Sequence, residues 1–462
     1  MDWIPTLTDR AGPLYRRIVE ALAEDIASGR LRRGQQLPTH RALAAHLGMD
    51  LTTVTRAYGE ARRQGLVQAR VGQGSFVADD RSPLAQHPAA SVDFDLSMII
   101  PPMPPEADIE GRTARGLAAL HRETGFAPLL AYRDFDGLTE QRSIIAAWLA
   151  RRIPDATGDR VRVFPGAQNA LFCLLIALAA PGDVLLVERH TYPGILAAAE
   201  TRQLKLVGIE TDGEGILPEA LEAACRLHRP KLLYLTPTIQ NPTTATLSPP
   251  RRKEIAEIVR RRDLLLIEDD AYGLLAPEMP PLAALIPDRT FHVATLSKCI
   301  TPGLRVAFLL SPDASAADRI AAVRRASVHM PTLLTVGLVL RWLRDGSADA
   351  IIAAVRAEAA ARQKLAATIL GDHPYAAHPN GHHLWLPLRN AWTASDFTAY
   401  LKKRGLAVDG ADAFRASGKP IPAIRLSLGT ENDRAKLVEG LGILEAALWA
   451  SPGSVRWQAT PE

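Results

Sequence analysis

The chain has 462 residues, of which 47% are hydrophobic and 23% are charged. This composition excludes a mainly disordered protein, and the length predicts two or three domains rather than one. The three cysteines show neither paired nor metal-ligand spacing, which argues against a disulfide scaffold, a zinc finger or another metal site. The N-terminus lacks the basic start and apolar core of a secretory signal, and the longest apolar run, residues 170–180, is too short to cross a bilayer. We therefore expect a soluble cytoplasmic protein without membrane contact.

The net charge of +4 is concentrated at one end of the chain. Residues 1–78 contain eleven arginines, no lysine and seven acidic residues, so the rest of the chain is neutral overall. Excess positive charge in one small segment indicates a polyanionic partner for that segment. The alternative is a helix-rich surface that happens to use arginine.

The first predicted helix spans residues 13–29. Its proline at the start and glycine at the end are typical of helix boundaries. Apolar residues recur on one face of this helix at Leu14, Ile18, Leu22 and Ile26.

Two more helices and a hairpin complete this segment. Residues 39–48 predict a short helix that Thr39 caps and Gly48 ends, and residues 51–65 predict a third helix with Asp50 or Thr52 as its cap. Residues 66–78 alternate between apolar and polar and contain glycines, as a β-hairpin does. This order of elements is that of a winged helix-turn-helix, which we assign to residues 1–78.

A recognition helix needs short polar and basic side chains near its N-terminus, where it meets the major groove. The third helix carries such side chains at Thr52, Thr53, Thr55 and Arg56. Val54 and Tyr58 of the same helix face the core. Arg41, early in the preceding helix, could reach a phosphate or a base edge. The hairpin tip with Gln73 and Gly74 is small enough to enter a minor groove. The alternative for the two arginines is a solvated face without DNA.

Residues 13–77 resemble the DNA-binding domain of GntR-type bacterial repressors over its full length. The resemblance implies that Arg41 contacts DNA, as do arginines early in the recognition helix. Leu51 and Thr55 stand where many relatives carry arginine. The operator preference of those relatives therefore does not transfer to this chain.

Residues 79–92 are polar, rich in proline and alanine and without periodicity, which predicts a linker to a second domain at residues 93–462. Short apolar runs then recur, many of them separated by amphipathic helical stretches, near residues 161, 184, 204, 231, 264, 291 and 304. This order predicts a large α/β domain around a mostly parallel sheet.

The run TLSKCITPGLR carries the strongest chemical signal of this second domain. Lys298 lies just past an apolar strand, and a lysine with a lowered pKa can form a Schiff base with an aldehyde. Arg305, with Thr295 and Ser297, could hold a phosphate. The alternative is an exposed loop lysine.

Three further motifs point to the same chemistry. The turn at residues 165–168 enters a helix, where backbone N–H groups bind phosphate. Glu268, Asp269 and Asp270 end an apolar strand, and a carboxylate there can pair with a protonated ring nitrogen. Alternatively, at least one of these acids is only the solvated end of the strand. Asn241, in an Asn-Pro turn, could bond a ring hydroxyl.

Together these motifs resemble the fold type I pyridoxal-phosphate enzymes, the aspartate aminotransferase superfamily, over about residues 93–450. The resemblance implies pyridoxal 5′-phosphate as cofactor, with Lys298 forming the internal aldimine. It also implies that Asp269 pairs with the ring nitrogen, that Tyr272 and Asn241 contact ring oxygen O3′, and that Tyr192 stacks on the ring. The cofactor phosphate would be bound by Ala167, Gln168, Thr295, Ser297 and Arg305. Arg425 would bind a substrate carboxylate. Tyr132 would reach the phosphate of the neighbouring subunit, which makes a homodimer part of the site.

Each of these residues has a plainer alternative. Tyr192 and Tyr132 could be ordinary half-buried tyrosines, Asn241 a turn former, and Arg425 the partner of a structural acid. Thr244 departs from the family, whose Asn-Pro-Thr turn usually continues with glycine, and we expect this change to affect the substrate pocket.

A GntR-type reader joined to an aminotransferase-like domain resembles the MocR subfamily. We therefore predict a homodimeric transcriptional regulator that binds operator DNA and senses an amine or amino-acid effector through a pyridoxal phosphate aldimine. Coupling requires the effector to bind two states of the protein with different affinity. One alternative is a working aminotransferase with an attached DNA-binding module. Another is a regulator whose effector is pyridoxal phosphate itself.

Overall fold

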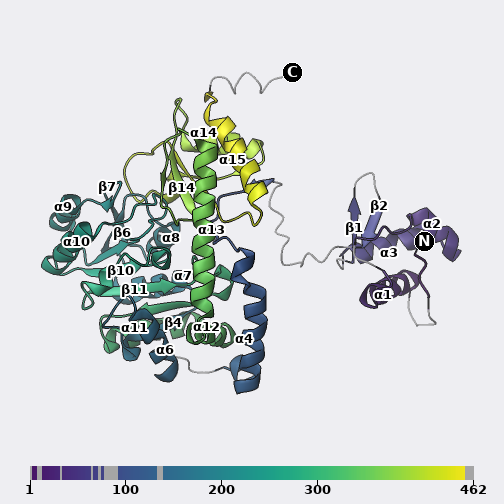
Figure 1. Cartoon of the computed structure of the whole chain (residues 1–462), viewed down its shortest axis with the longest axis horizontal. Coiled ribbons are helices and arrows are strands. Elements are labelled where there is room, and N and C mark those ends of the chain that lie inside the picture. The colour runs from purple at the N-terminus through teal and green to yellow at the C-terminus, as the bar shows by residue number, and fades with distance from the viewer. Residues whose placement is uncertain are drawn as a thin grey trace. The chain divides into compact units, whose positions relative to one another are not determined.

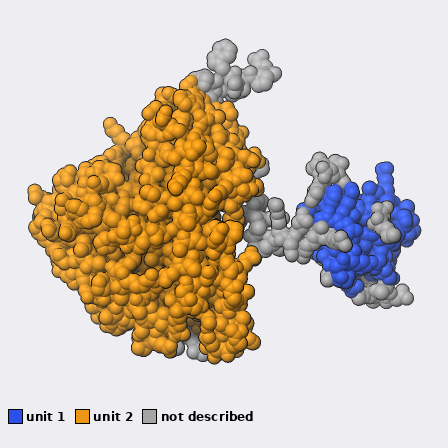
Figure 2. All heavy atoms as spheres, in the orientation of Figure 1, with its two compact units in different colours: residues 1–91 blue, residues 92–462 orange. Residues whose placement is uncertain are grey.

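The structure is a computed structural model that describes residues 3–7, 13–31, 34–63, 66–70, 74–77, 92–132 and 139–452. The chain divides into two compact units, residues 1–91 and 92–462 (Figure 2). The predicted linker, apart from Val92, lies outside the described residues. Within the ranges described, no helix is both long and apolar enough to cross a membrane.

The N-terminal unit contains the predicted three helices and hairpin. They are α1 (Leu14–Ala27), α2 (His40–Leu47), α3 (Leu51–Arg63), β1 (Val67–Arg70) and β2 (Gly74–Val77), the two strands being antiparallel. Helices α1 and α2 both pack on α3. The core includes Ile18, Leu22, Val54 and Tyr58. Leu14, the first residue of α1, lies outside this core and is 43% exposed.

Local hydrogen bonds explain where these helices begin and end. The Thr39 side chain accepts a hydrogen bond from the backbone N–H of Ala42 at 3.2 Å and starts α2. Gly48 ends α2 in the left-handed conformation, with φ of 60°, which glycine adopts without strain. Asp50 rather than Thr52 caps α3, because its carboxylate accepts from both the backbone N–H (2.7 Å) and the hydroxyl of Thr52.

A seven-stranded sheet forms the centre of the second unit (Figure 1). Its strands, in spatial order, are β4 (Val161–Phe164), β12 (Ala307–Leu310), β11 (Thr290–Thr295), β10 (Leu265–Asp269), β9 (Leu232–Leu235), β5 (Val184–Glu188) and β6 (Lys205–Ile209). Only β12 runs antiparallel to its neighbours. The seven apolar runs predicted from the sequence are these seven strands, so the α/β class with a mostly parallel sheet is confirmed.

Helices cover both faces of this sheet, which is why its strands are apolar on both sides. Leu232 and Tyr234 of β9 pack with α7 (Ala167–Leu178), α8 (Pro193–Thr201) and α11 (Ala314–Val328). Leu233 and Leu235, which alternate with them, pack with α9 (Pro218–His228) and α10 (Pro249–Arg261).

The rest of the unit consists of further helices and a smaller antiparallel sheet. The helices are α4 (Ile109–Thr124), α5 (Ala127–Leu130), α6 (Thr139–Leu149), α12 (Leu333–Arg344), the 24-residue α13 (Ser347–Leu370), α14 (Ala394–Lys403) and α15 (Arg434–Leu448). The smaller sheet has the order β13 (Ala376–Ala377), β14 (His383–Pro387), β17 (Ala423–Ser427) and β16 (Asp409–Gly410). Two short pairs complete the unit: β3 (Phe94–Asp95) with β15 (Leu406–Ala407), and β7 (Thr211–Asp212) with β8 (Gly215–Ile216). Helix α13 packs against both α12 and α15 (Figure 1).

Candidate functional site

A cavity of about 160 Å³ lies beside the ends of β10 and β11. The sequence-predicted cofactor contacts, apart from Tyr132, all line it: Ala167, Gln168, Tyr192, Asn241, Asp269, Tyr272, Thr295, Ser297, Lys298 and Arg305. Residues from five separate segments of the chain therefore meet at one place. Parallel strands bring this about, because the turns that follow their carboxyl ends lie along the same edge of the sheet.

Lys298 follows β11 and points into this cavity rather than out of an exposed loop. Its Nζ donates a hydrogen bond to the carbonyl of Ile99 at 2.6 Å. Burial, together with the nearby charge of Arg425, lowers the pKa of Lys298 to about 8. A substantial fraction of this amine is therefore neutral, and so nucleophilic, near neutral pH.

Asp269 ends β10 and offers an unused acceptor to the cavity. Its Oδ2 accepts a hydrogen bond from the Tyr234 hydroxyl at 2.8 Å, whereas its buried Oδ1 has no partner among the described residues. Burial raises the pKa of this carboxyl to about 6. A cationic N–H donor placed against Oδ1 would satisfy both the orphaned atom and the buried charge, so the residue fits a protonated pyridine nitrogen.

The two acids beside Asp269 are also buried, so the alternative that one of this group is a solvated strand end is wrong. The Nδ1 atom of His292 lies 3.0 Å from Glu268, and its Nε2 lies 3.6 Å from Asp270. Arg152 forms an ion pair with Asp270. This network holds the end of β10 behind Asp269 and has no part in lining the Lys298 cavity.

The other end of the cavity suits a phosphate. Gly166 precedes α7 with φ of 93°, and a Cβ there would lie 2.5 Å from Arg305, which explains the glycine. Arg305 is exposed, donates only a long 3.4 Å hydrogen bond to the Pro165 carbonyl, and has no acidic partner within the described ranges. The hydroxyls of Thr295 and Ser297 lie 3.1 Å apart beside it. Free guanidinium, hydroxyl and helix N-terminal donors together fit a phosphate dianion.

Arg425 lies on β17, is buried, and does not line the cavity. Its Nη1 donates to Asn241 Oδ1 at 2.9 Å. Its Nη2 donates to both the Asp409 carboxylate and the Ser97 carbonyl. Arg425 therefore pairs with an acid of its own chain, as the second of the two interpretations of the sequence proposed. Asn241, for its part, connects the cavity to this arginine.

Several residues around the cavity could not be found from motifs. The Nε2 atom of His382 lies 2.6 Å from the Lys298 carbonyl, and that of His383 lies 3.0 Å from the Gln240 carbonyl. Burial lowers their pKa values to about 4 and about 3, so both rings are neutral at physiological pH. Two adjacent histidines before an apolar strand were the only available signal. Asp409 lies in no motif at all.

Tyr132 lies outside the cavity. Its side chain is 86% exposed and its ring centroid is 5.6 Å from that of His329. Two nearby apolar side chains, Phe126 and Leu130, are also exposed.

Thr244 adopts a φ of 65°, a conformation that favours glycine and accounts for the glycine usual at this position. Its buried side chain lines a different cavity, of about 610 Å³, together with His190 and Trp385. Thr244 is therefore not among the residues that line the Lys298 cavity.

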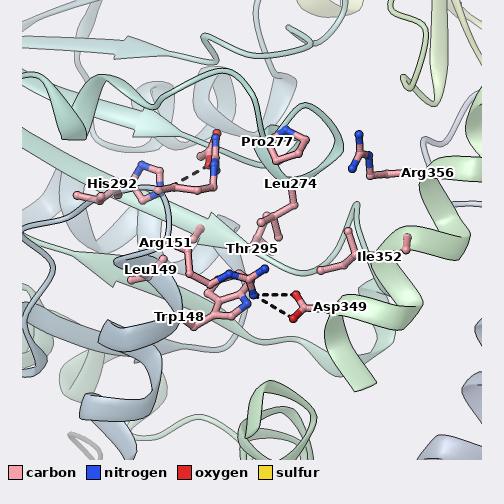
Figure 3. A pocket seen from close by; sticks show the side chains of 15 residues that line it. Trp148, Leu149, Arg151, Leu274, Pro277, His292, Thr295, Asp349, Ile352 and Arg356 are labelled. Atoms are coloured by element: carbon pink, nitrogen blue, oxygen red, sulfur yellow. Dashed lines mark hydrogen bonds and ion pairs between the residues drawn. The ribbon is translucent and has the colours of Figure 1, made fainter. Parts of the chain in front are cut away.

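A third cavity, of about 280 Å³, lies among α6, β11 and α13 (Figure 3). Arg151 and Asp349 form an ion pair across part of it, at 2.8 Å. Of the candidate residues named from the sequence, only Asp270 and Thr295 line it, and no lysine of the described chain does. It is therefore a less suitable place for the predicted chemistry.

The residues predicted to contact DNA differ in their exposure and in whether their side chains already interact with other residues. Arg41 and Thr55 are exposed, the latter with its hydroxyl 3.3 Å from a ring nitrogen of His40. The guanidinium of Arg56 lies over the Tyr15 ring, 4.2 Å from its centroid.

The remaining predicted contacts lie at the start of α3 and at the hairpin. Thr52 is exposed but gives its hydroxyl to Asp50, and Thr53 is partly buried. Gly74 is exposed at the start of β2, and Gln73 lies outside the described residues.

Comparison with known proteins agrees with both units. Residues 14–77 match the bacterial regulatory proteins of the gntR family, and residues 114–441 match aminotransferase class I and II. The uncharacterized HTH-type transcriptional regulator YdeF of Bacillus subtilis is 28% identical over 450 residues, 97% of each chain. The vitamin B6 salvage pathway transcriptional repressor PtsJ of Salmonella typhimurium is 28% identical over 91% of this chain and 96% of its own. The crystal structure of the α-aminoadipate aminotransferase LysN of Thermus thermophilus covers 78% of this chain and 95% of its own, with a TM-score of 0.70 and 25% identity.

Proposed function

Because the chain belongs to the MocR subfamily, which joins a gntR-type DNA-binding domain to an aminotransferase class I and II domain, we propose that it is a transcriptional regulator controlled by an amine or amino acid bound at its pyridoxal phosphate site. The observation that carries the proposal is one cavity holding a lysine of lowered pKa, an orphaned buried carboxylate oxygen and an exposed arginine without an acidic partner in the described chain. These three groups match the aldehyde, ring nitrogen and phosphate of the cofactor.

The chain's own groups are arranged for exchange of one amine for another. Bound pyridoxal phosphate supplies an aldehyde with which primary amines condense reversibly. Lys298, which lines the cavity, would hold the cofactor in the absence of effector, and an incoming amine would compete with it for that position. The Ile99 carbonyl, 2.6 Å from Nζ in this structure, gives the released lysine an acceptor. Asp269 would pair with the pyridine nitrogen and favour its protonated form, and Arg305 with Thr295 and Ser297 would hold the phosphate.

The N-terminal unit reads the operator. We assign phosphate or base contacts to Arg41, Thr52, Thr53, Thr55, Arg56, Gln73 and Gly74. Effector binding changes DNA affinity to the extent that the effector prefers one state of the protein, with residues 79–92 as the connection between the domains.

The functional unit in this proposal is a homodimer. Phe126, Leu130 and Tyr132, three exposed apolar or aromatic residues close together in sequence, support it, since exposed large apolar groups mark contact sites. Tyr132 would then reach the phosphate of the partner's site. Two DNA-binding domains in one dimer would read a repeated operator.

An enzyme with full transaminase turnover is the second candidate, because Lys298 is also suited to move protons at the substrate carbon once it is released. Adding an amino acid and then a 2-oxo acid to the purified protein separates the two. In a sensor, the cofactor absorption changes once on addition of the effector and returns to its initial spectrum when the effector is removed. An enzyme converts the cofactor to its amine form, which only the oxo acid reverses.

The proposal is tested first by reducing the purified protein with borohydride and sequencing its peptides by mass spectrometry. A pyridoxyl group on Lys298, together with DNA binding that changes on addition of amines, supports it. An unmodified Lys298 in protein supplied with pyridoxal phosphate contradicts it. DNA binding that follows cofactor concentration and ignores amines would favour pyridoxal phosphate itself as effector.

A further inference from the structure

The arginine expected to receive an effector carboxylate already has one from its own chain. Asp409, on the edge strand β16, lies directly opposite Arg425 on β17. Its Oδ2 accepts a hydrogen bond from Arg425 Nη2. The position that a bound carboxylate would take on the guanidinium is therefore held by a protein side chain.

The remaining donors of Arg425 leave little room for a second carboxylate. A guanidinium has five N–H donors, and carboxylates bind best to two that point the same way. Both hydrogens of Nη2 are used, by Asp409 and the Ser97 carbonyl, and Nη1 donates to Asn241. The buried Nε has no partner in the described chain. A carboxylate ligand therefore gains a two-point contact only if Asp409 leaves.

Charge favours the same conclusion. Arg425 is 6% exposed, so it is a buried cation neutralised by Asp409. A second carboxylate would leave two anions on one cation in a largely dehydrated place, which is unfavourable. An amine without a carboxylate leaves the existing pair intact.

The two partners differ in their freedom to move. The Asp409 side chain is 34% exposed and belongs to a two-residue strand at the edge of the sheet. Arg425 lies on β17, between β14 and β16, with its guanidinium over the Phe414 ring. Asp409 is therefore the partner that can turn to solvent and give up its place.

We propose that Asp409 is a specificity-determining residue, which competes with the carboxylate of an amino acid for Arg425 and so makes the site favour primary amines that lack this carboxylate. The inference rests on the proposed function, because it concerns the effector of the same site. It names the effector class as simple primary amines.

Matched ligands test this directly. For three side chains, the amino acid, the amine without the carboxylate and the acid without the amino group are compared: alanine, ethylamine and propanoate; leucine, 3-methylbutylamine and 4-methylpentanoate; phenylalanine, 2-phenylethylamine and 3-phenylpropanoate. Binding of the amines and amino acids to the cofactor-loaded protein is followed by cofactor absorption. Binding of the acids, which cannot condense with an aldehyde, is measured by calorimetry.

The variant is Asp409→Asn, which keeps the shape and removes the charge. Asp412→Asn is the matched control, because Asp412 lies three residues away and pairs with Arg415 instead. If circular dichroism shows that D409N is poorly folded, Asp409→Ser replaces it. Exchanging a charged for a neutral acceptor is worth about a factor of ten.

We expect the natural protein to bind each amine at least tenfold more tightly than the corresponding amino acid. In D409N this preference should fall by about tenfold, the acids should bind more tightly, and D412N should match the natural protein. An unchanged ratio in D409N would overturn the inference. If no amine or amino acid alters the cofactor in any variant while the acids bind D409N more tightly, the competition at Arg425 stands and the proposed effector chemistry fails.

Discussion

The two arginines of the pyridoxal phosphate region illustrate two different situations. Arg305 is exposed, and its only hydrogen bond within the described residues is a long one to a backbone carbonyl. Arg425 is buried and bonded to Asp409, Asn241 and a carbonyl. The family resemblance assigns both to anions, yet only Arg305 is available to an anion from outside the chain.

The cause of this difference lies in the neighbours of each arginine. Arg305 follows a short turn that holds backbone and hydroxyl groups but no acid. Arg425 is on a strand whose neighbour places Asp409 at the same register position. A motif locates a cation along the chain, whereas strand pairing decides whether that cation is available.

The largest expected effect is that of Lys298→Ala. Lys298 is the only amine among the described residues that line the cavity, so its removal should abolish the pyridoxyl adduct after borohydride reduction, as measured by peptide mass. Lys231→Ala is the control, since Lys231 is exposed and paired with Asp183. Basal DNA binding of the Lys298 variant should persist. If it disappears as well, the cofactor has a structural role.

Replacing the open arginine should weaken cofactor binding strongly. Losing charge-assisted hydrogen bonds to a phosphate costs about 1.5–3 kcal/mol, so Arg305→Ala should raise the Kd of the cofactor by about 10- to 100-fold. Arg425→Gln, at the occupied arginine, should change this Kd by less than about threefold. Equilibrium dialysis with absorption measures both values, and Arg319→Ala on the surface of α11 is the control. Equal losses in the two variants would contradict the distinction between them.

Much of the fold could be predicted from the sequence because strand and cap signals are local. The seven apolar runs became the seven strands, and the Thr39 and Gly48 signals bound α2 as expected. The sequence-predicted cofactor residues gather in one cavity because their motifs all follow strands of one sheet.

The rest depended on tertiary contacts. Nothing in the order of residues says that Asp409 faces Arg425, or that Leu14 lies beyond the core of the first unit. His382 and His383 bond to the carbonyls of Lys298 and Gln240, which are far away along the chain.

The same contrast between open and engaged arginines occurs on the DNA-binding unit. Arg41 and Arg56 are both exposed, but the guanidinium of Arg56 stacks on the Tyr15 ring whereas that of Arg41, at the start of α2, does not. We expect Arg41→Ala to weaken operator binding by about tenfold and to lower the slope of log K against log salt by about 1, as loss of one phosphate contact does. Arg56→Ala should have a smaller effect on the slope. Fluorescence anisotropy at several salt concentrations measures both, with Arg30→Ala, whose arginine pairs with Asp25, as control. A slope unchanged by Arg41→Ala would exclude its phosphate contact.

The smallest expected effect is a change in the pKa of Lys298, which Arg425 influences through its charge. Burial and the positive charge of Arg425 hold the pKa of Lys298 at about 8, well below the 10.5 of an exposed lysine. Only the neutral amine attacks an aldehyde, so the rate at which cofactor-free protein captures pyridoxal phosphate should rise with pH and reach half its maximum near pH 8. Arg425→Gln removes a positive charge that disfavours the ammonium form, so it raises this pKa. The midpoint should then move to higher pH, and capture at pH 7 should slow severalfold. Stopped-flow absorption between pH 6 and 10 gives the profile. A midpoint that stays in place would mean that the charge of Arg425 does not contribute to the pKa of Lys298.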